Sequence, residues 1–245
     1  MAAAPRGVNR FYLLLGAVAL IGVGALAWLA SGGGSTGIPA NVTIQPSDTA
    51  GFRGYVLGSA DAPVEIVEYA DYECPACQQF EVVQFPAVRR QLIDAGKVRW
   101  VYRDFPLEMH RFARLAAHAA ACADEQGKFW EMHNRIYQGH SDWASRGNAA
   151  PAFRDYAGEI GLDVDQYGEC MDSAKFAGRI QASLEEGVAV GVGSTPSFLI
   201  GGRIYPGAIS SDQIRRLADS LAALQPAATA GTGTAGDSLP EPAAP

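Results

Sequence analysis

The chain has 245 residues, with 19 Lys and Arg against 26 Asp and Glu, and a formal net charge of −7. This acidic balance, with no basic run to neutralise phosphates, argues against nucleic acid or anionic lipid as a partner. Hydrophobic residues make up 48% of the chain, which is enough for one domain with a substantial core.

Residues 11–30 form a run of twenty residues without a charge, long enough to span a bilayer at ~1.5 Å rise per residue. Arg6 and Arg10 precede the run without an acid, which predicts a cytoplasmic N-terminus at 1–10 and an exported remainder. A cleaved signal peptide is the alternative, because residues 25–27 fit an A-x-A cleavage site. We favour a retained signal anchor that crosses the cell (inner) membrane once, with the folded part on the extracytoplasmic side.

Two further segments have compositions that disfavour folding. Residues 31–50 are rich in Gly and Ser and then polar and turn-prone, so they are expected to be a flexible linker. Residues 225–245 contain mostly Pro, Ala, Gly and Thr without an aromatic residue, and are expected to be a disordered tail. One folded domain is therefore expected at 51–224.

The domain begins with a strand–helix–strand pattern. An apolar, β-prone run at 63–70 is followed by a helix at 74–95, in which Pro86 should cause a kink and Gly96 should end the helix. A second strand is expected at 98–102. Because this spacing is typical of a βαβ unit, the two strands should be parallel.

A block of helices follows, and then a hairpin and a last helix. A Gly-Gly turn between two short apolar runs predicts the antiparallel hairpin. This order is typical of an α/β fold with a helical insert at about 107–190. The expected helices are at about 110–125, 128–137, 151–160, 165–171, 173–190 and 211–224, and the hairpin strands at 197–200 and 203–205.

The tetrad Cys74-Pro75-Ala76-Cys77 is the most informative motif. Two thiols at the first turn of a helix can close a disulfide, and the unpaired N–H groups and positive dipole end there stabilise a thiolate on the first sulfur. Half of a zinc site and an inert structural disulfide are the alternatives. Zinc would need two more ligands nearby, which the sequence does not offer, and so short a disulfide loop constrains little.

The sequence resembles the thioredoxin fold and, more narrowly, the DsbA-like thiol:disulfide oxidoreductases of bacterial envelopes. The resemblance covers about residues 50–224. It implies a redox disulfide between Cys74 and Cys77 and no cofactor or metal. The motifs that carry it are residues 58–64, residues 68–77, residues 127–133, and Gly193-Ser194-Thr195-Pro196 with Phe198.

Several residues take expected roles. Cys74, nearest the solvent, should be the nucleophile, and Cys77 the resolving thiol. The resemblance implies a buried, proton-transferring Glu68, although a strand acid that faces solvent is the alternative. If Pro196 is cis, Thr195 can pair its main chain with an extended substrate, and its hydroxyl can lower the pKa of Cys74; a trans proline at the start of a strand is the alternative.

The resemblance also implies a second cysteine pair, Cys122 and Cys170. An exported protein can keep such a structural disulfide, whereas two buried thiols are the alternative. Asp71 and Glu73 would oppose a thiolate on Cys74 if they lie close to it, and the sequence leaves this balance open. Residues 75 and 76 carry no positive side chain, which predicts a less extreme oxidant than relatives with His beside the second Cys.

The leading hypothesis is an extracytoplasmic dithiol oxidase that introduces disulfides into reduced or unfolded exported proteins. A membrane redox partner would then reset Cys74 and Cys77. One alternative is a disulfide reductase or isomerase. Another is a non-enzymatic copper(I) chaperone, because soft thiolates select this ion, although Met-rich or further His ligands are missing.

Overall fold

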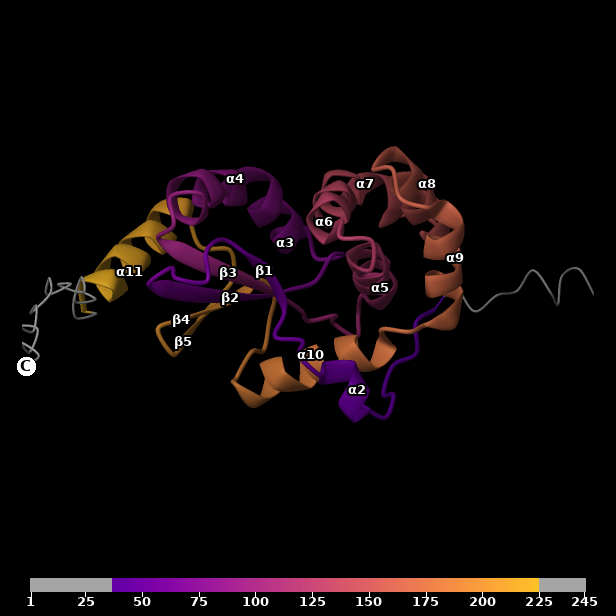
Figure 1. Ribbon diagram of the computed structural model, residues 1–245, viewed down its shortest axis with the longest axis horizontal. Coiled ribbons are helices and arrows are strands. Elements are labelled where there is room, and N and C mark those ends of the chain that lie inside the picture. Colours follow the sequence, from indigo (N-terminus) through magenta and orange to yellow (C-terminus); the bar gives the residue numbers. More distant parts are fainter. Residues whose placement is uncertain (1–36, 225–245) are drawn as a thin grey trace, which may run out of the picture.

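The computed structural model describes residues 37–224 (Figure 1). The expected cytoplasmic segment at 1–10, the anchor at 11–30 and the tail at 225–245 lie outside these residues. Within the described part, no helix combines the length and the apolar character needed to cross a membrane.

A five-stranded sheet in the order β1-β3-β2-β4-β5 forms the centre of the fold. β2 and β3 are parallel, as the βαβ pattern predicts, and every other neighbouring pair is antiparallel. The hairpin between β4 and β5 turns at Gly201 and Gly202, whose positive φ angles of 56° and 76° suit glycine. The strands are β1 (Tyr55–Leu57), β2 (Val64–Ala70), β3 (Val98–Asp104), β4 (Ser197–Ile200) and β5 (Arg203–Pro206).

The sheet lies between two layers of helices (Figure 1). The helical segment after β2 and the last helix, α11 (Ser211–Leu224), cover one face. Trp100 of β3 and Phe198 of β4 meet Phe80 and Phe85 there in an aromatic core. α10 (Ala177–Ala189) packs on the other side against β3. The α/β arrangement with a helical insert, as expected from the sequence, is confirmed.

The helix expected at 74–95 is divided into alternating α and π segments. The N–H of Phe85 bonds to the carbonyl of Phe80, and the N–H of Asp94 bonds to that of Arg89, each five residues back. Pro86 has no N–H to donate, so the regular ladder is interrupted there rather than only bent. The segments are α3 (Pro75–Gln79), η1 (Phe80–Gln84), α4 (Phe85–Val88) and η2 (Arg89–Ile93).

The helical insert occupies the half of the molecule beside the sheet (Figure 1). The sequence predicts a helix boundary at 171–173. In the structure α9 ends at Ser173, and the residue that caps it, Ala174, adopts a left-handed φ of 50°. The four-residue α7 was not expected, because so short a segment has no visible periodicity. The insert helices before α10 are α5 (Ala113–Asp124), α6 (Phe129–Gln138), α7 (His140–Trp143), α8 (Ala150–Glu159) and α9 (Val164–Ser173).

Part of the expected linker at 31–50 is ordered. Residues 37–50 contain the short helix α2 (Pro46–Thr49), which packs against α10, and Ile38 is buried in the core of the insert. The folded unit therefore begins before residue 51. The polar composition of this segment concealed its fold, because the segment docks through only two apolar side chains, Ile38 and Val42, and one helical turn.

Candidate active site

Cys74 is the N-cap residue of α3. Its backbone is extended, with φ −71° and ψ 121°, and Pro75 occupies the first helical position. Proline suits that position because its φ is already helical and the N–H that it lacks would have had no partner within the helix. Cys77 follows one turn later and is 0% exposed, against 7% for Cys74. The first sulfur is thus the more accessible one.

The two cysteines are free thiols with opposite acidities. The pKa of Cys74 is lowered to about 5, chiefly by a hydrogen bond from the Cys77 thiol and also by the Thr195 side chain and nearby backbone N–H groups, while burial opposes this. Burial raises the pKa of Cys77 well above its ordinary value, and interactions with Cys74 raise it further. At neutral pH the pair therefore consists of one thiolate and one thiol.

The Thr195–Pro196 peptide bond is cis and lies opposite Cys74. The Sγ atom of Cys74 is 3.5 Å from the carbonyl oxygen of Thr195. Within residues 37–224, the buried Thr195 hydroxyl has no partner in the dithiol form. It is therefore available to donate to a thiolate, and this interaction lowers the pKa of Cys74. The carbonyl of Pro196 accepts the Gly207 N–H at 2.8 Å, which fixes the loop to the chain after β5.

Glu68 of β2 is fully buried rather than facing solvent. The indole N–H of Trp100 donates to its Oε2 atom at 3.1 Å. Burial, and then the nearby Glu81 carboxyl, raises the pKa of Glu68 well above its ordinary value. The charge of Glu68 in turn raises the pKa of Cys77. Glu68 is thus electrostatically coupled to the second cysteine.

Glu81 is a second buried carboxyl, which the sequence analysis missed. It follows Cys77 by four residues along the helical segment, and this spacing places the two side chains on one face. That spacing alone could have pointed to Glu81 as a neighbour of Cys77 in the sequence. Burial raises the pKa of Glu81 to about 8. The Oε2 atom lies 3.3 Å from His133 Nε2, but burial lowers the pKa of His133 to about 3, so this imidazole is neutral.

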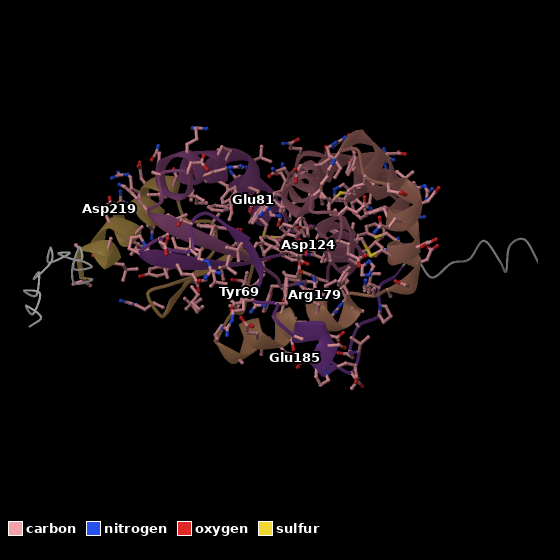
Figure 2. All side chains as sticks on the ribbon, viewed as in Figure 1. Tyr69, Glu81, Asp124, Arg179, Glu185 and Asp219 are labelled. Carbon is pink, nitrogen blue, oxygen red and sulfur yellow. A yellow bond between two sulfur atoms is a disulfide. The ribbon has the colours of Figure 1, made fainter. Side chains whose placement is uncertain are left out.

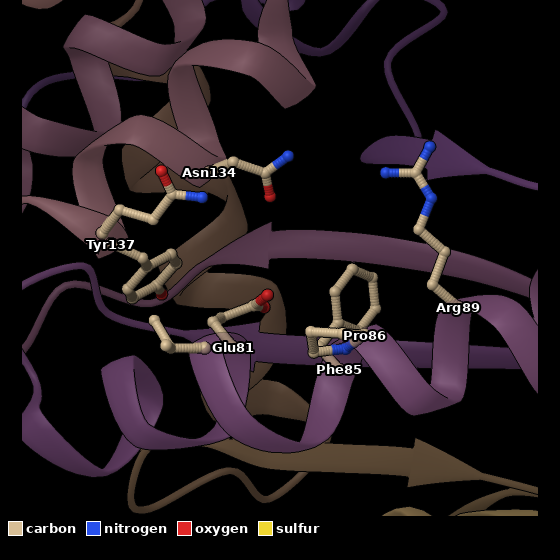
Figure 3. Close-up of a pocket in the computed structure, with 8 residues that line it drawn as sticks. Glu81, Phe85, Pro86, Arg89, Asn134 and Tyr137 are labelled. Carbon is tan, nitrogen blue, oxygen red and sulfur yellow. The ribbon is translucent and has the colours of Figure 1, made fainter.

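A cavity of about 220 Å³ adjoins Glu81 (Figure 3). Figure 3 shows the Glu81 carboxyl directed into the space between Asn134 and Tyr137 of α6 and Phe85 of α4. Arg89, whose side chain is partly exposed, also lines this space. In the whole molecule, Glu81 lies where the helices over the sheet meet the insert (Figure 2). The Glu81 carboxyl therefore borders a cavity rather than closed protein interior.

The sequence left open how Asp71 and Glu73 affect Cys74. Both side chains accept hydrogen bonds from the segment before α5. Asp71 Oδ1 accepts the N–H of Glu73 at 2.8 Å, and its Oδ2 accepts Leu107 N–H at 2.8 Å and His110 Nδ1–H at 2.7 Å. A carboxylate oxygen of Glu73 accepts the N–H of Phe112. Hydrogen-bond donors from residues 107–112 thus offset the negative charges of Asp71 and Glu73.

Cys122 and Cys170 form a disulfide that joins α5 to α9 inside the insert (Figure 2). The S–S distance is 2.05 Å. His118 lies beside it, with Nδ1 3.5 Å from Cys122 Sγ. These three residues are the one group of possible metal ligands found among residues 37–224, and the disulfide already occupies both sulfurs.

A protein-family model described as Thioredoxin matches residues 52–220. A structure of BdbD from Bacillus subtilis, in its oxidised form, superposes with a TM-score of 0.63 at 24% identity and covers 74% of this chain and 98% of that one. At this identity the likeness concerns the fold. It agrees with the α/β sheet and the insert described above.

Curated relatives match more than half of this chain. "Na(+)/H(+) antiporter NhaA 3" of Salinispora tropica is 41% identical over 157 residues, 63% of this chain and 22% of the antiporter. "Probable disulfide bond formation protein D" of Bacillus anthracis is 27% identical over 153 residues, 60% of this chain and 70% of that protein. The match thus spans less than a quarter of the antiporter, and most of the disulfide bond formation protein.

Proposed function

Because the chain belongs to the thioredoxin family, we propose that it is a thiol:disulfide oxidoreductase that works through Cys74 and Cys77. The observation that carries this proposal is the division of acidity between the two sulfurs. Cys74 has a pKa lowered to about 5 and Cys77 has a raised pKa. A stable thiolate is a good leaving group, and a neighbouring thiol can resolve a mixed disulfide.

In the proposed direction, the oxidised enzyme takes two electrons from a substrate dithiol. A substrate thiolate attacks Cys74 Sγ, the Cys74–Cys77 bond breaks, and Cys77 leaves and takes up a proton. The second substrate thiol, as its thiolate, then attacks the substrate sulfur of the mixed disulfide and expels Cys74 as a thiolate. The substrate gains a disulfide and the enzyme keeps the two electrons. A substrate held in extended form would pair its main chain with Thr195.

Glu68 is proposed to provide the proton for Cys77. Burial raises the pKa of Glu68 well above its ordinary value, which favours the protonated carboxyl that a proton donor needs, and Glu68 interacts electrostatically with Cys77. Glu81 interacts with Glu68 and borders the cavity of Figure 3. This arrangement supports exchange of the proton with solvent through that cavity.

Dithiol oxidation is the direction that the site supports best. A low pKa at Cys74 stabilises the reduced enzyme, which makes its disulfide oxidising. The name of the Bacillus anthracis relative supports the same direction. The proposed substrates are reduced or unfolded exported proteins, and a membrane redox partner would reoxidise the cysteines. Residues 11–30 would anchor the chain in the cell membrane, with the domain on the extracytoplasmic side.

The reduction potential of the Cys74–Cys77 pair tests the direction. A value near about −120 mV supports an oxidase, whereas one near about −270 mV would assign the enzyme to reduction. Two variants test the mechanism itself. Cys74→Ser should abolish exchange, and Cys77→Ser should accumulate mixed disulfides with substrates, visible on non-reducing gels. Full activity in both variants would refute the proposed site.

A further inference from the structure

The loop between β3 and α5 places a histidine near the N-terminus of α3. His110 Nδ1–H donates to Asp71 Oδ2 at 2.7 Å, and the N–H of Leu107 donates to the same oxygen at 2.8 Å. The Asp71 side chain is completely buried, and the His110 side chain is 17% exposed. Because a buried carboxylate needs a compensating charge, this geometry favours the protonated imidazole.

Asp71 is also tied to both cysteines through its backbone. The N–H of Cys74 donates to the Asp71 carbonyl at 3.1 Å, and the N–H of Asp71 donates to Cys77 Sγ at 3.5 Å. The hydrogen bond to Asp71 is the largest cause that raises the pKa of His110, and the charge of Cys74 raises it further, while burial opposes both. Asp71 therefore joins the imidazole, which its carboxylate binds, to the Cys74 backbone and the Cys77 sulfur, and this places His110 near the start of α3.

We propose that His110 supplies the positive charge beside Cys74 that the tetrad itself lacks, with Asp71 as the positioning residue that holds the imidazole in place. Pro75 and Ala76 carry no charge, so the residues between the two cysteines cannot act in this way. The cation instead comes from a loop more than thirty residues later in the sequence. His110 touches no reacting atom, and its effect on Cys74 is electrostatic.

The other charged groups around His110 do not replace it. Arg111 lies over the ring of Phe112, and Arg114 donates to Gln181. Among the hydrogen bonds and ion pairs of residues 37–224, neither arginine is a partner of Asp71. The titratable groups that face His110 are Asp71, Glu73 and Cys74 from the segment before α3, Glu108 and Arg111 from its own loop, and Arg114 from α5.

Nuclear magnetic resonance titration of the wild-type histidines tests the proposal without a mutation. Electrostatic coupling is reciprocal, so the Cys74 thiolate must raise the pKa of His110 by as much as the imidazolium lowers that of Cys74. We expect the pKa of His110 to be higher in the dithiol than in the disulfide form by roughly half a unit to one unit. His118, which lies beside the second disulfide, is the internal reference. An unchanged His110, or an equal change at His118, would overturn the proposal.

Substitution gives an independent test. His110→Gln keeps a donor for Asp71 but removes the charge, so the pKa of Cys74, followed by the ultraviolet absorbance of the thiolate, should rise by the same half a unit to one unit, roughly. A tenfold change in the equilibrium makes the potential about 30 mV more negative. His110→Lys should restore much of the loss, and Arg111→Gln, which removes an adjacent charge, should change neither quantity.

An unchanged pKa of Cys74 in His110→Gln, or the same increase in Arg111→Gln, would overturn the proposal. If His110→Gln does not fold, the titration of the wild-type protein decides alone. Both measurements concern the acidity of one sulfur. A negative result in these measurements would refute the role of His110 but leave the proposed exchange reaction intact. A negative result in the exchange assays would refute the exchange reaction but leave the coupling between His110 and Cys74 intact.

Discussion

Among single residues, Glu68 has the chemistry that depends most on burial. It forms no ion pair with a cation among residues 37–224, and one neutral hydrogen bond from Trp100 satisfies Oε2. Such a carboxyl is more easily protonated than an exposed one, because transfer from water penalises the charged form. A group of this kind suits proton transfer at near-neutral pH better than it suits structural support.

Glu68→Gln tests this role with a side chain of nearly the same size. We expect the reduction of the Cys74–Cys77 disulfide by a dithiol substrate at pH 7 to slow by about tenfold or more, because the departing Cys77 loses its proton donor. Stopped-flow fluorescence measures this rate. Glu65→Gln is the matched control, since Glu65 lies on the same strand but is exposed and paired with Arg99 at 2.6 Å. Equal slowing in both variants would contradict the role.

Thr195 affects Cys74 through its hydroxyl as well as through its main chain. Thr195→Val keeps the shape of the side chain but removes the donor, so the pKa of Cys74 should rise by roughly half a unit to one unit. The thiolate absorbance of the reduced protein, titrated from low to high pH, measures the shift. Ser197→Ala is a useful comparison, because the Ser197 hydroxyl donates to the Ser194 carbonyl and not to sulfur. A shift in Ser197→Ala alone would show that loop geometry, and not the hydroxyl, sets the acidity.

At the scale of one element, the start of α3 makes stability depend on pH. The folded pKa of Cys74 is about 5 and the ordinary thiol value is 9.0, so the thiolate stabilises the reduced fold fully above pH 9 and loses this contribution as pH falls to 5. Cys77, whose folded pKa is raised, stays protonated in the folded chain across this window. Its unfolded form ionises only near pH 9, so Cys77 opposes the gain only at the upper end of the window.

The reduced protein should therefore gain stability relative to the oxidised protein as pH rises from 5 to 9. Urea unfolding of both forms at several pH values measures the difference. The buried carboxyls are common to the two forms, so the comparison removes most of their contribution. A difference that is constant with pH, or one that falls, would contradict the lowered pKa of Cys74.

The disulfide between α5 and α9 should act mainly on stability. Its closed loop has a sequence separation of 48 residues, for which the chain-entropy model gives about 4 kcal/mol. We expect Cys122→Ala with Cys170→Ala to lower the free energy of unfolding by about 3–4 kcal/mol. Exchange at Cys74 should remain close to the wild-type level at 25 °C. A loss of exchange in a variant that is still folded would show that this pair participates in the chemistry.

At the scale of the whole molecule, residue types and spacing predict local contacts, whereas contacts across the chain, such as Cys122–Cys170, were expected only from the family resemblance. The start of α3 at Cys74 and the Gly201-Gly202 turn follow from their own residue types, and the parallel strands follow from the βαβ spacing. The pairing of Asp71 with His110 joins segments 39 residues apart, so no spacing rule reveals it. β1 was missed because its three residues are defined by pairing with β3.

The proposed anchor at residues 11–30 determines where the folded domain is located. If residues 11–30 are a retained anchor, the full chain should remain in the membrane fraction after an alkaline wash, whereas a chain that starts at residue 31 behind a cleavable export signal should be released. In intact cells, a membrane-impermeant maleimide should label Cys74 after mild reduction, because only an extracytoplasmic domain is within its reach. Cys74→Ser is the control for labelling at this site. Labelling that appears only after lysis would place the domain in the cytoplasm, where a disulfide such as Cys122–Cys170 is rarely maintained.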